Sequence, residues 1–146
     1  LFAASVADEL KLGVEGVSGI DGKVCGICSE LELSDLVERH PASLSGGQKQ
    51  RVVIAAAIAK GARLVFLDEP TSGLDGKSMK RVAEAVRALA SETRAVFVIT
   101  HDFEFVLSCC TRIVRIEDGT VACDVPVKTD EADRVRKAFY RGRGMP

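Results

Sequence analysis

The sequence predicts an α/β fold organised around a parallel β-sheet. Two short apolar runs, RLVFLD at 63–68 and RAVFVIT at 94–100, are rich in strand-forming residues. Between them, apolar residues recur at helical spacing, at Val82, Ala85, Val86 and Leu89. Uninterrupted apolar strands that alternate with a helix are typical of a parallel sheet covered on both faces.

The composition fits a globular protein and excludes several other classes. The chain has 146 residues, a length sufficient for one domain with a core. Of these residues, 47% are hydrophobic and 28% are charged, which is typical of a globular protein. The net charge of −1 produces no overall field that would favour nucleic acid or an acidic membrane. The longest apolar runs are far shorter than the roughly 18 residues that span a bilayer, and no segment resembles a signal peptide.

The cysteines indicate reduced thiols, because their number is odd and no secretory signal precedes them. Cys25 and Cys28 have the spacing of half a zinc site, but no second half follows. We therefore interpret all five as structural or incidental thiols, namely Cys25, Cys28, Cys109, Cys110 and Cys123.

The first part of the chain is rich in glycine, which predicts short helices only. Ser5 is a candidate cap for one short helix, and residues 30–39 are a candidate for another. The motif Ser45-Gly-Gly-Gln48 has the form of a capping box and predicts a helix that runs to about Lys60, with Gly61 as its stop.

The last part of the chain predicts a hairpin and a helix. RIVRIEDGTVACDV, residues 112–125, contains two alternating runs joined by Asp118-Gly119, a strong hairpin signal. Residues 129–140 predict a final helix, acidic at its start and basic at its end. Its apolar residues Val135, Ala138 and Phe139 favour a helix that packs on the protein rather than on a membrane.

Three features at predicted phosphate-facing positions carry the chemistry. The helix that begins at Gly46 and Gly47 offers first-turn N–H groups and a positive dipole end to an anion such as phosphate. Asp68 and Glu69 follow the first strand, at the sheet edge where parallel α/β proteins bind ligands. An aspartate there can hold Mg²⁺, and the next carboxylate can activate a water. His101 follows the second strand and is positioned to contact a phosphate oxygen.

These motifs, in this order and spacing, resemble the ATP-binding-cassette (ABC) ATPase family. LSGGQKQR resembles its signature motif, LVFLDEPTSGLD its Walker B strand and D-loop, and VFVITHD its switch histidine. The resemblance covers about residues 41–119. It implies a P-loop NTPase fold in which two domains pair head to tail around two ATP molecules.

The resemblance also implies roles for individual residues. Asp68 would serve Mg²⁺, Glu69 would be the general base, and His101 would sense the γ-phosphate. The signature residues would contact the ATP of the partner domain, and Asp75 would couple the two sites across the interface. The signature residues of this ATP-binding set are Ser45, Gly46, Gly47 and Gln48.

One part of the family pattern is missing from the sequence. The phosphate-binding loop G-x-x-x-x-G-K-[ST] occurs nowhere. DGKS at 75–78 and DGKV at 21–24 imitate its end, but Thr71 and Val17 stand where its first glycine is required. We therefore expect a partial ABC fold that lacks the Walker A part and begins just after the family's Q-loop. We also expect that this part alone neither binds ATP tightly nor hydrolyses it. Its expected parts are the remainder of the helical subdomain, the ABC core and a C-terminal helix with its tail, at 1–40, 41–128 and 129–146.

The starting segment LFAASVADEL and the segment from Thr100 to Val121 resemble the second cassette of energy-coupling-factor importers of vitamins and metal ions. This resemblance implies transmembrane partner subunits and a place on the cytoplasmic face of the membrane, with no nucleic-acid partner. Another cassette importer or exporter is the next alternative. Two others are a non-transport cassette protein of translation or DNA repair, and a non-catalytic remnant that only binds a partner.

Overall fold

The computed structural model describes residues 1–91, 93–128 and 132–140. The chain divides into two compact units, Leu1–Ile99 and Thr100–Pro146. The first unit contains α1 (Val6–Lys11), α2 (Ile20–Glu30), α3 (Gly46–Ala59), β1 (Leu64–Asp68), α4 (Gly76–Leu89) and β2 (Ala95–Ile99). Two 3₁₀ turns, Ser34–Leu36 and Pro41–Ser43, lie between α2 and α3. The second unit contains α5 (Phe103–Cys109), β3 (Arg112–Glu117), β4 (Thr120–Pro126) and α6 (Ala132–Tyr140).

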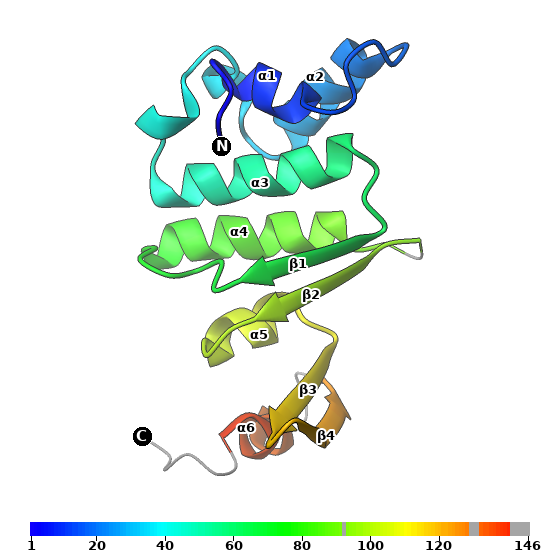
Figure 1. The fold of residues 1–146 in the computed structure, drawn as a ribbon. Coiled ribbons are helices and arrows are strands. Elements are labelled where there is room, and N and C mark those ends of the chain that lie inside the picture. The colour runs from blue at the N-terminus through cyan, green and yellow to red at the C-terminus, as the bar shows by residue number, and fades with distance from the viewer. Residues whose placement is uncertain (92, 129–131, 141–146) are drawn as a thin grey trace. The chain divides into compact units, whose positions relative to one another are not determined.

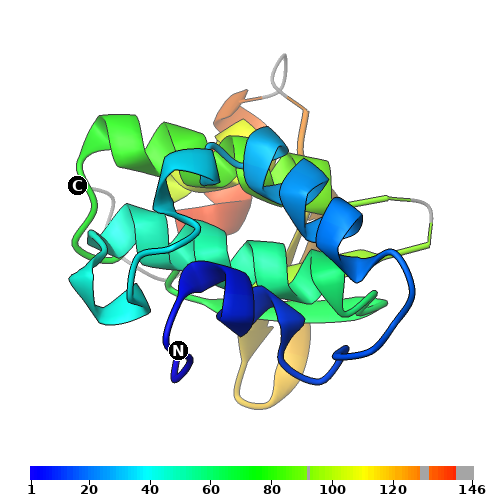
Figure 2. The ribbon, with the colours of Figure 1, turned by 90° about the horizontal axis from the view of Figure 1, so that it is seen from above.

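Helix α3 is the centre of the first unit. It packs against α1, α2 and α4, and Figures 1 and 2 show α3 and α4 running side by side. Val52, Ile54 and Ala55 of α3 are fully buried. The predicted end of this helix is confirmed, because Lys60 is its C-cap and Gly61 follows with a left-handed φ of 66°. The predicted core face of α4 is also confirmed, since Val82, Ala85, Val86 and Leu89 are buried.

The segment before α3 differs from the sequence prediction. Ser5 caps α1 as expected, but α2 continues through Gly22 and Gly26. Its residues Ile20, Val24, Ile27 and Cys28 are buried, and this packing outweighs the low helix propensity of glycine. The predicted helix at 30–39 is wrong. Glu32 has a left-handed φ of 52° that ends the helical path, and only a single 3₁₀ turn follows.

Strands β1 and β2 pair in parallel, in register from Leu64↔Ala95 to Asp68↔Ile99, as predicted. Val65 and Leu67 of β1 are buried. The prediction that both faces are covered is wrong for these strands, because Leu64, Phe66, Phe97 and Ile99 are between 50% and 63% exposed. The Phe66 and Phe97 rings stack on that exposed face with their centroids 5.0 Å apart.

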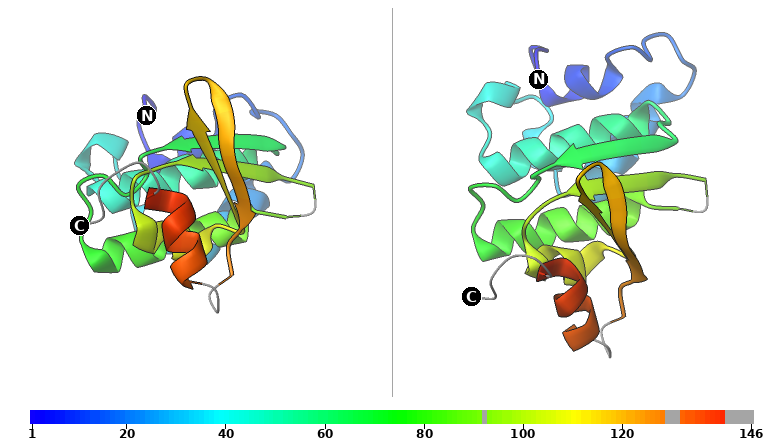
Figure 3. Two further views of the ribbon diagram at one scale, coloured as in Figure 1. Left: turned by 90° about the horizontal axis from the view of Figure 1, so that it is seen from below. Right: turned by 60° about the horizontal axis from the view of Figure 1, so that its bottom comes forward.

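The second unit contains the predicted hairpin and final helix. β3 and β4 pair antiparallel, and the turn residues Asp118 and Gly119 have φ values of 49° and 74°, which such a tight hairpin turn requires. α6 packs against both strands (Figure 3), with Val135 buried in a cluster with Phe103, Val106 and Ile113. The beginning of the predicted helix, residues 129–131, lies outside the described residues. None of the helices in the described part of the chain has the length and apolar character that a membrane span requires.

Candidate functional site

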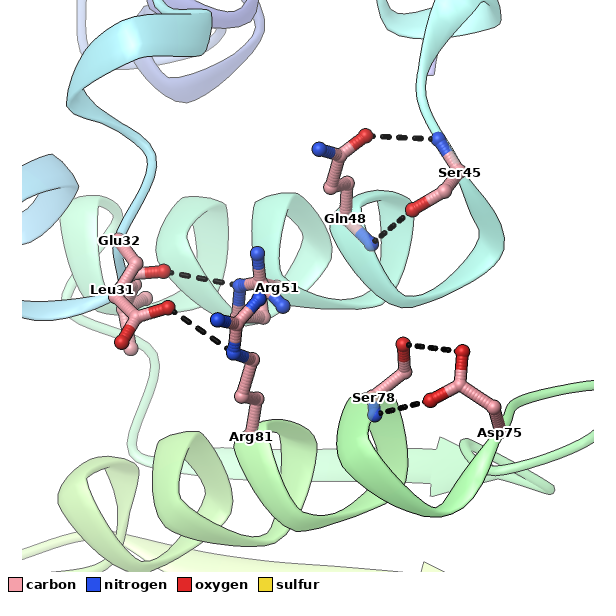
Figure 4. Close-up of polar contacts among 8 residues, drawn as sticks. All are labelled: Leu31, Glu32, Ser45, Gln48, Arg51, Asp75, Ser78 and Arg81. Carbon is pink, nitrogen blue, oxygen red and sulfur yellow. Dashed lines mark hydrogen bonds and ion pairs between the residues drawn. The ribbon is translucent and has the colours of Figure 1, made fainter.

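The start of α3 is a fixed, capped helix end. The Ser45 side chain accepts a hydrogen bond from the Gln48 N–H at 3.3 Å, and the Ser45 N–H donates to Gln48 Oε1 at 2.9 Å (Figure 4). This is the predicted capping box, so the side chain of Gln48 is used within the helix end itself. The two glycines differ in environment, because Gly46 is exposed whereas Gly47 is buried. The first-turn N–H groups have no intrahelical partner and form the positive end of a helix of 14 residues.

The loop that ends at Asp75 lies directly beside this helix end. A Cβ built on Gly46 would lie 3.1 Å from Leu74 Cδ2, and one built on Gly47 would lie 3.0 Å from Ser78 Cβ. Asp75 caps α4: its carboxylate accepts hydrogen bonds from the Ser78 N–H at 2.8 Å and from the Ser78 hydroxyl at 3.3 Å (Figure 4). The bond from the Ser78 backbone, together with that from its side chain, holds the pKa of the Asp75 carboxyl below its ordinary value. The structure therefore brings Ser45, Gly46, Gly47 and Asp75 to the adjacent N-terminal ends of two packed helices.

Asp68 and Glu69 stand at the carboxyl end of β1, as predicted. Asp68 is exposed, whereas Glu69 is half-buried and has a left-handed φ of 43°. This conformation is uncommon for a residue with a side chain and is concentrated at functional sites. The Glu69 N–H donates to the Ile99 carbonyl at 2.8 Å, and the Glu69 carbonyl accepts from the Ser72 N–H at 3.1 Å. These two bonds stabilise the backbone of the turn that contains Glu69.

His101 belongs to the second unit and is exposed. Asp102, which follows it, caps α5 by accepting a hydrogen bond from the Phe105 N–H at 2.9 Å. The contact of His101 with a phosphate stays a prediction. Among the described residues, no group of three or more His, Cys, Asp or Glu side chains is arranged to hold a metal ion.

Sequence reasoning did not assign a role to Arg51, which the structure places in the core. The residue is only 5% exposed, and its Nε donates to the Leu31 carbonyl at 3.0 Å (Figure 4). Burial and the neighbouring Arg81 lower the pKa of the Arg51 guanidinium. On α4, Arg81 pairs with Glu32 at 3.2 Å. The strained turn at Leu31 and Glu32 is therefore held from both helices that carry the site. The sequence signal was a charged residue on the otherwise apolar side of α3.

Comparison with known proteins shows that the chain is similar to ATP-binding proteins of ABC transporters. The model of the family described as "ABC transporter" matches residues 6–72. A Treponema denticola protein that bears the name of an ABC transporter ATP-binding protein is 44% identical over 124 residues, covering 85% of this chain and 25% of that protein. The macrolide export ATP-binding/permease protein MacB of Nitrobacter winogradskyi is 39% identical over 102 residues, covering 70% of this chain and 16% of that protein.

A solved structure has the same arrangement of elements. Clostridium perfringens cbiO1, part of the ABC transporter complex cbiONQ, superposes with a TM-score of 0.78 and 25% identity, covering 99% of this chain and 59% of that chain. The fold is thus the α/β fold of ABC ATPases, with its parallel strands and helices. The chain spans about a quarter of the length of the Treponema relative.

Proposed function

Because this chain belongs to the ABC transporter ATPase family, we propose that its protein binds and hydrolyses ATP as the nucleotide-binding part of a transporter. The observation that carries the proposal is the geometry of the first unit. The family's signature residues form a capped helix start beside Asp75, and Asp68 and Glu69 stand at the carboxyl end of β1 with Glu69 in a strained turn.

The residues present fit ATP and Mg²⁺ as cofactors. The exposed Gly46 leaves the backbone at the positive end of α3 open to an anionic group, so Ser45, Gly46 and Gly47 would hold the γ-phosphate of an ATP bound by a second cassette domain. Asp68 would ligate Mg²⁺, an ion that proteins bind through one or two carboxylates together with phosphate oxygens and waters. When bound, the ion neutralises phosphate charge. Gln48 supports this set by holding the backbone of Ser45.

The remaining residues of the site act on the attacking water and on the interface. Glu69, which follows β1 with a left-handed backbone conformation, would orient and deprotonate the water. His101 would contact the γ-phosphate. Asp75 would lie at the head-to-tail interface with the second domain and link the two sites.

We further propose that residues 1–146 supply only one part of a complete ATP site. No stretch of the sequence has the phosphate-binding loop, whose backbone and lysine hold the phosphates in this class of enzyme. The 146-residue chain alone would therefore not hydrolyse ATP. Within it, residues 1–40 would be the remainder of the helical subdomain, 41–128 the ABC core and 129–146 the C-terminal helix and tail.

The resemblance of the sequence to energy-coupling-factor importers is the ground for proposing uptake of a vitamin or a metal ion. The similarity to cbiO1, part of the ABC transporter complex cbiONQ, supports a role in transport. The similarity to MacB favours export as the second candidate. In either case the protein would work on the cytoplasmic face of a membrane, bound to transmembrane subunits. Purification of the complete gene product with its membrane partners separates the two, because the partner that co-purifies is either an importer subunit or an export permease.

The test of the proposed activity is ATP turnover by the complete gene product. Glu69→Gln should slow turnover by about 10²- to 10⁴-fold while ATP binding is retained, because the base is lost but the phosphate contacts are not. Glu84→Gln on the exposed side of α4 is the matched control and should leave turnover unchanged. Near-normal turnover by the Glu69→Gln variant would remove Glu69 from this role, and a wild-type protein without turnover would refute the proposed function.

A further inference from the structure

The two glycines that begin α3 are the only described glycines with close neighbours. A Cβ added at any other described glycine would find nothing within 4 Å. A Cβ at Gly46 would meet the end of the flexible Leu74 side chain, which can move aside. A Cβ at Gly47 would meet Ser78 Cβ at 3.0 Å and Ser78 Oγ at 3.4 Å. The contact at Gly47 is the stricter one, because Ser78 Cβ is attached directly to the backbone of α4.

Ser78 is itself held in place. It lies in the first turn of α4, where its N–H and its hydroxyl both donate to the Asp75 carboxylate, at 2.8 Å and 3.3 Å. A side chain at position 47 would therefore push on a residue that is bonded to the Asp75 cap. The distance between the start of α3 and the Asp75 loop depends on the absence of a Cβ at Gly47.

We propose that Gly47 is a positioning residue whose missing side chain lets the starts of α3 and α4 touch, so that the signature backbone and Asp75 present one surface to the second cassette domain. The significance for ATP turnover rests on the proposed function, whereas the packing role does not. Gly46, which is exposed, is the glycine that leaves room for a ligand. Gly47, which is buried, leaves room for Ser78.

Helix propensity lets the proposal predict the direction in which a Gly→Ala substitution changes stability. Alanine favours a helix over glycine, so an unobstructed Gly→Ala change inside a helix raises stability. Gly26→Ala in α2, where nothing lies within 4 Å, is the matched control and should raise the melting temperature of the complete gene product. Gly47→Ala should lower it, because the clash with Ser78 outweighs the gain in propensity.

The decisive experiment pairs Gly47→Ala with two changes at position 78. Ser78→Gly removes the Cβ that the new methyl group meets, whereas Ser78→Ala removes only the hydroxyl and keeps the Cβ. In the complete gene product, Gly47→Ala should lower kcat for ATP by about tenfold. This factor is the rate equivalent of the lower part of the free-energy range measured for overpacked contacts. The KM for ATP should change little, because the substitution removes no group that contacts the nucleotide. Addition of Ser78→Gly should restore kcat to within about threefold of the Ser78→Gly single variant, and addition of Ser78→Ala should not.

Three results would overturn the proposal. If Ser78→Gly restores neither kcat nor the melting temperature, position 47 faces the ligand rather than α4. If Ser78→Gly restores the melting temperature but not kcat, Gly47 serves stability alone. If Gly47→Ala raises the melting temperature as Gly26→Ala does, the contact with Ser78 does not exist. A wild-type protein without ATP turnover would refute the proposed function instead, and the melting temperatures of the same variants would still decide the packing role.

Discussion

The exposed face of the β1–β2 sheet predicts that the 146-residue chain associates with itself. Phe66 and Phe97 are 63% and 50% exposed and stack on each other, with Leu64 and Ile99 on the same face. A buried aromatic side chain covers about 150–250 Å², so the two rings leave roughly 170–280 Å² of apolar surface in water. At about 25 cal/mol per Å², covering this surface would contribute roughly 4–7 kcal/mol per chain.

A second copy of the chain would cover both faces at once and gain roughly twice that amount, before the 4–15 kcal/mol that association costs. At the low end of that cost the balance is roughly 4–10 kcal/mol in favour of association, which corresponds to dissociation constants from about millimolar to tens of nanomolar. The exposed N–H and C=O groups along the edges of a two-stranded sheet add a further route to pairing. Light scattering and analytical ultracentrifugation of the purified chain across a concentration series should therefore show oligomers.

The matched variants locate the surface responsible. Phe66→Thr combined with Phe97→Thr keeps residues that favour strands but removes the rings, and should shift the chain toward monomer. Ile116→Thr in the hairpin, at a residue 67% exposed, is the control and should leave association unchanged. A monodisperse monomer at all concentrations, or a loss of association in the Ile116→Thr variant alone, would refute the reasoning.

Two further predictions concern the helices that carry the site. Arg51→Met should destabilise the chain by about 1–3 kcal/mol in chemical denaturation, because it leaves the Leu31 carbonyl without its buried donor. Arg81→Met removes an exposed ion pair and should lower the stability by less than about 1 kcal/mol. Equal losses of stability in the two variants would contradict the assigned role of Arg51. Asp75→Ala should destabilise the chain at neutral pH by removing the α4 cap, and the difference from wild type should shrink as the pH falls. The hydrogen bond from the Ser78 N–H depresses the folded-state pKa of Asp75 below its ordinary value. The stabilisation by the ionised form is therefore complete above the unfolded-state pKa and is lost as the pH falls through the folded-state pKa. A difference that stays constant down to pH 2 in unfolding measurements would show that the charge of Asp75 is irrelevant.

The sequence was sufficient where local chemistry decides the structure. The capping box at Ser45 and Gln48, the hairpin turn at Asp118 and Gly119, and the parallel pair of strands all follow from short patterns whose partners are close in the chain or strongly apolar. It failed where tertiary packing decides. α2 runs through two glycines because its buried face stabilises it, and Glu32 ends the helical path that the sequence of residues 30–39 suggests.

For the candidate site, the sequence predicted which residues matter but not how the backbone holds them. Nothing in the pattern LVFLDEP alone shows that Glu69 has a left-handed φ, although the following Pro70 disfavours the right-handed helical conformation there. Likewise, adjacent glycines at a helix start predict ligand access at both positions. The structure separates them, because burial and the nearness of Ser78 give Gly47 a different reason to be glycine.

The contacts of α3 and α4 also connect the start of the chain to the site. The turn after α2 is bound to α3 through Arg51 and Leu31 and to α4 through Arg81 and Glu32. One turn or less toward their N-terminal ends, the same two helices carry Gln48 and Ser78, which hold the backbone of Ser45 and the carboxylate of Asp75. Packed helices move as bodies, because their interiors are too dense to deform locally. A force applied to residues 1–40, the part that we propose is the remainder of the helical subdomain, would therefore displace the signature backbone and the Asp75 loop together rather than one of them alone.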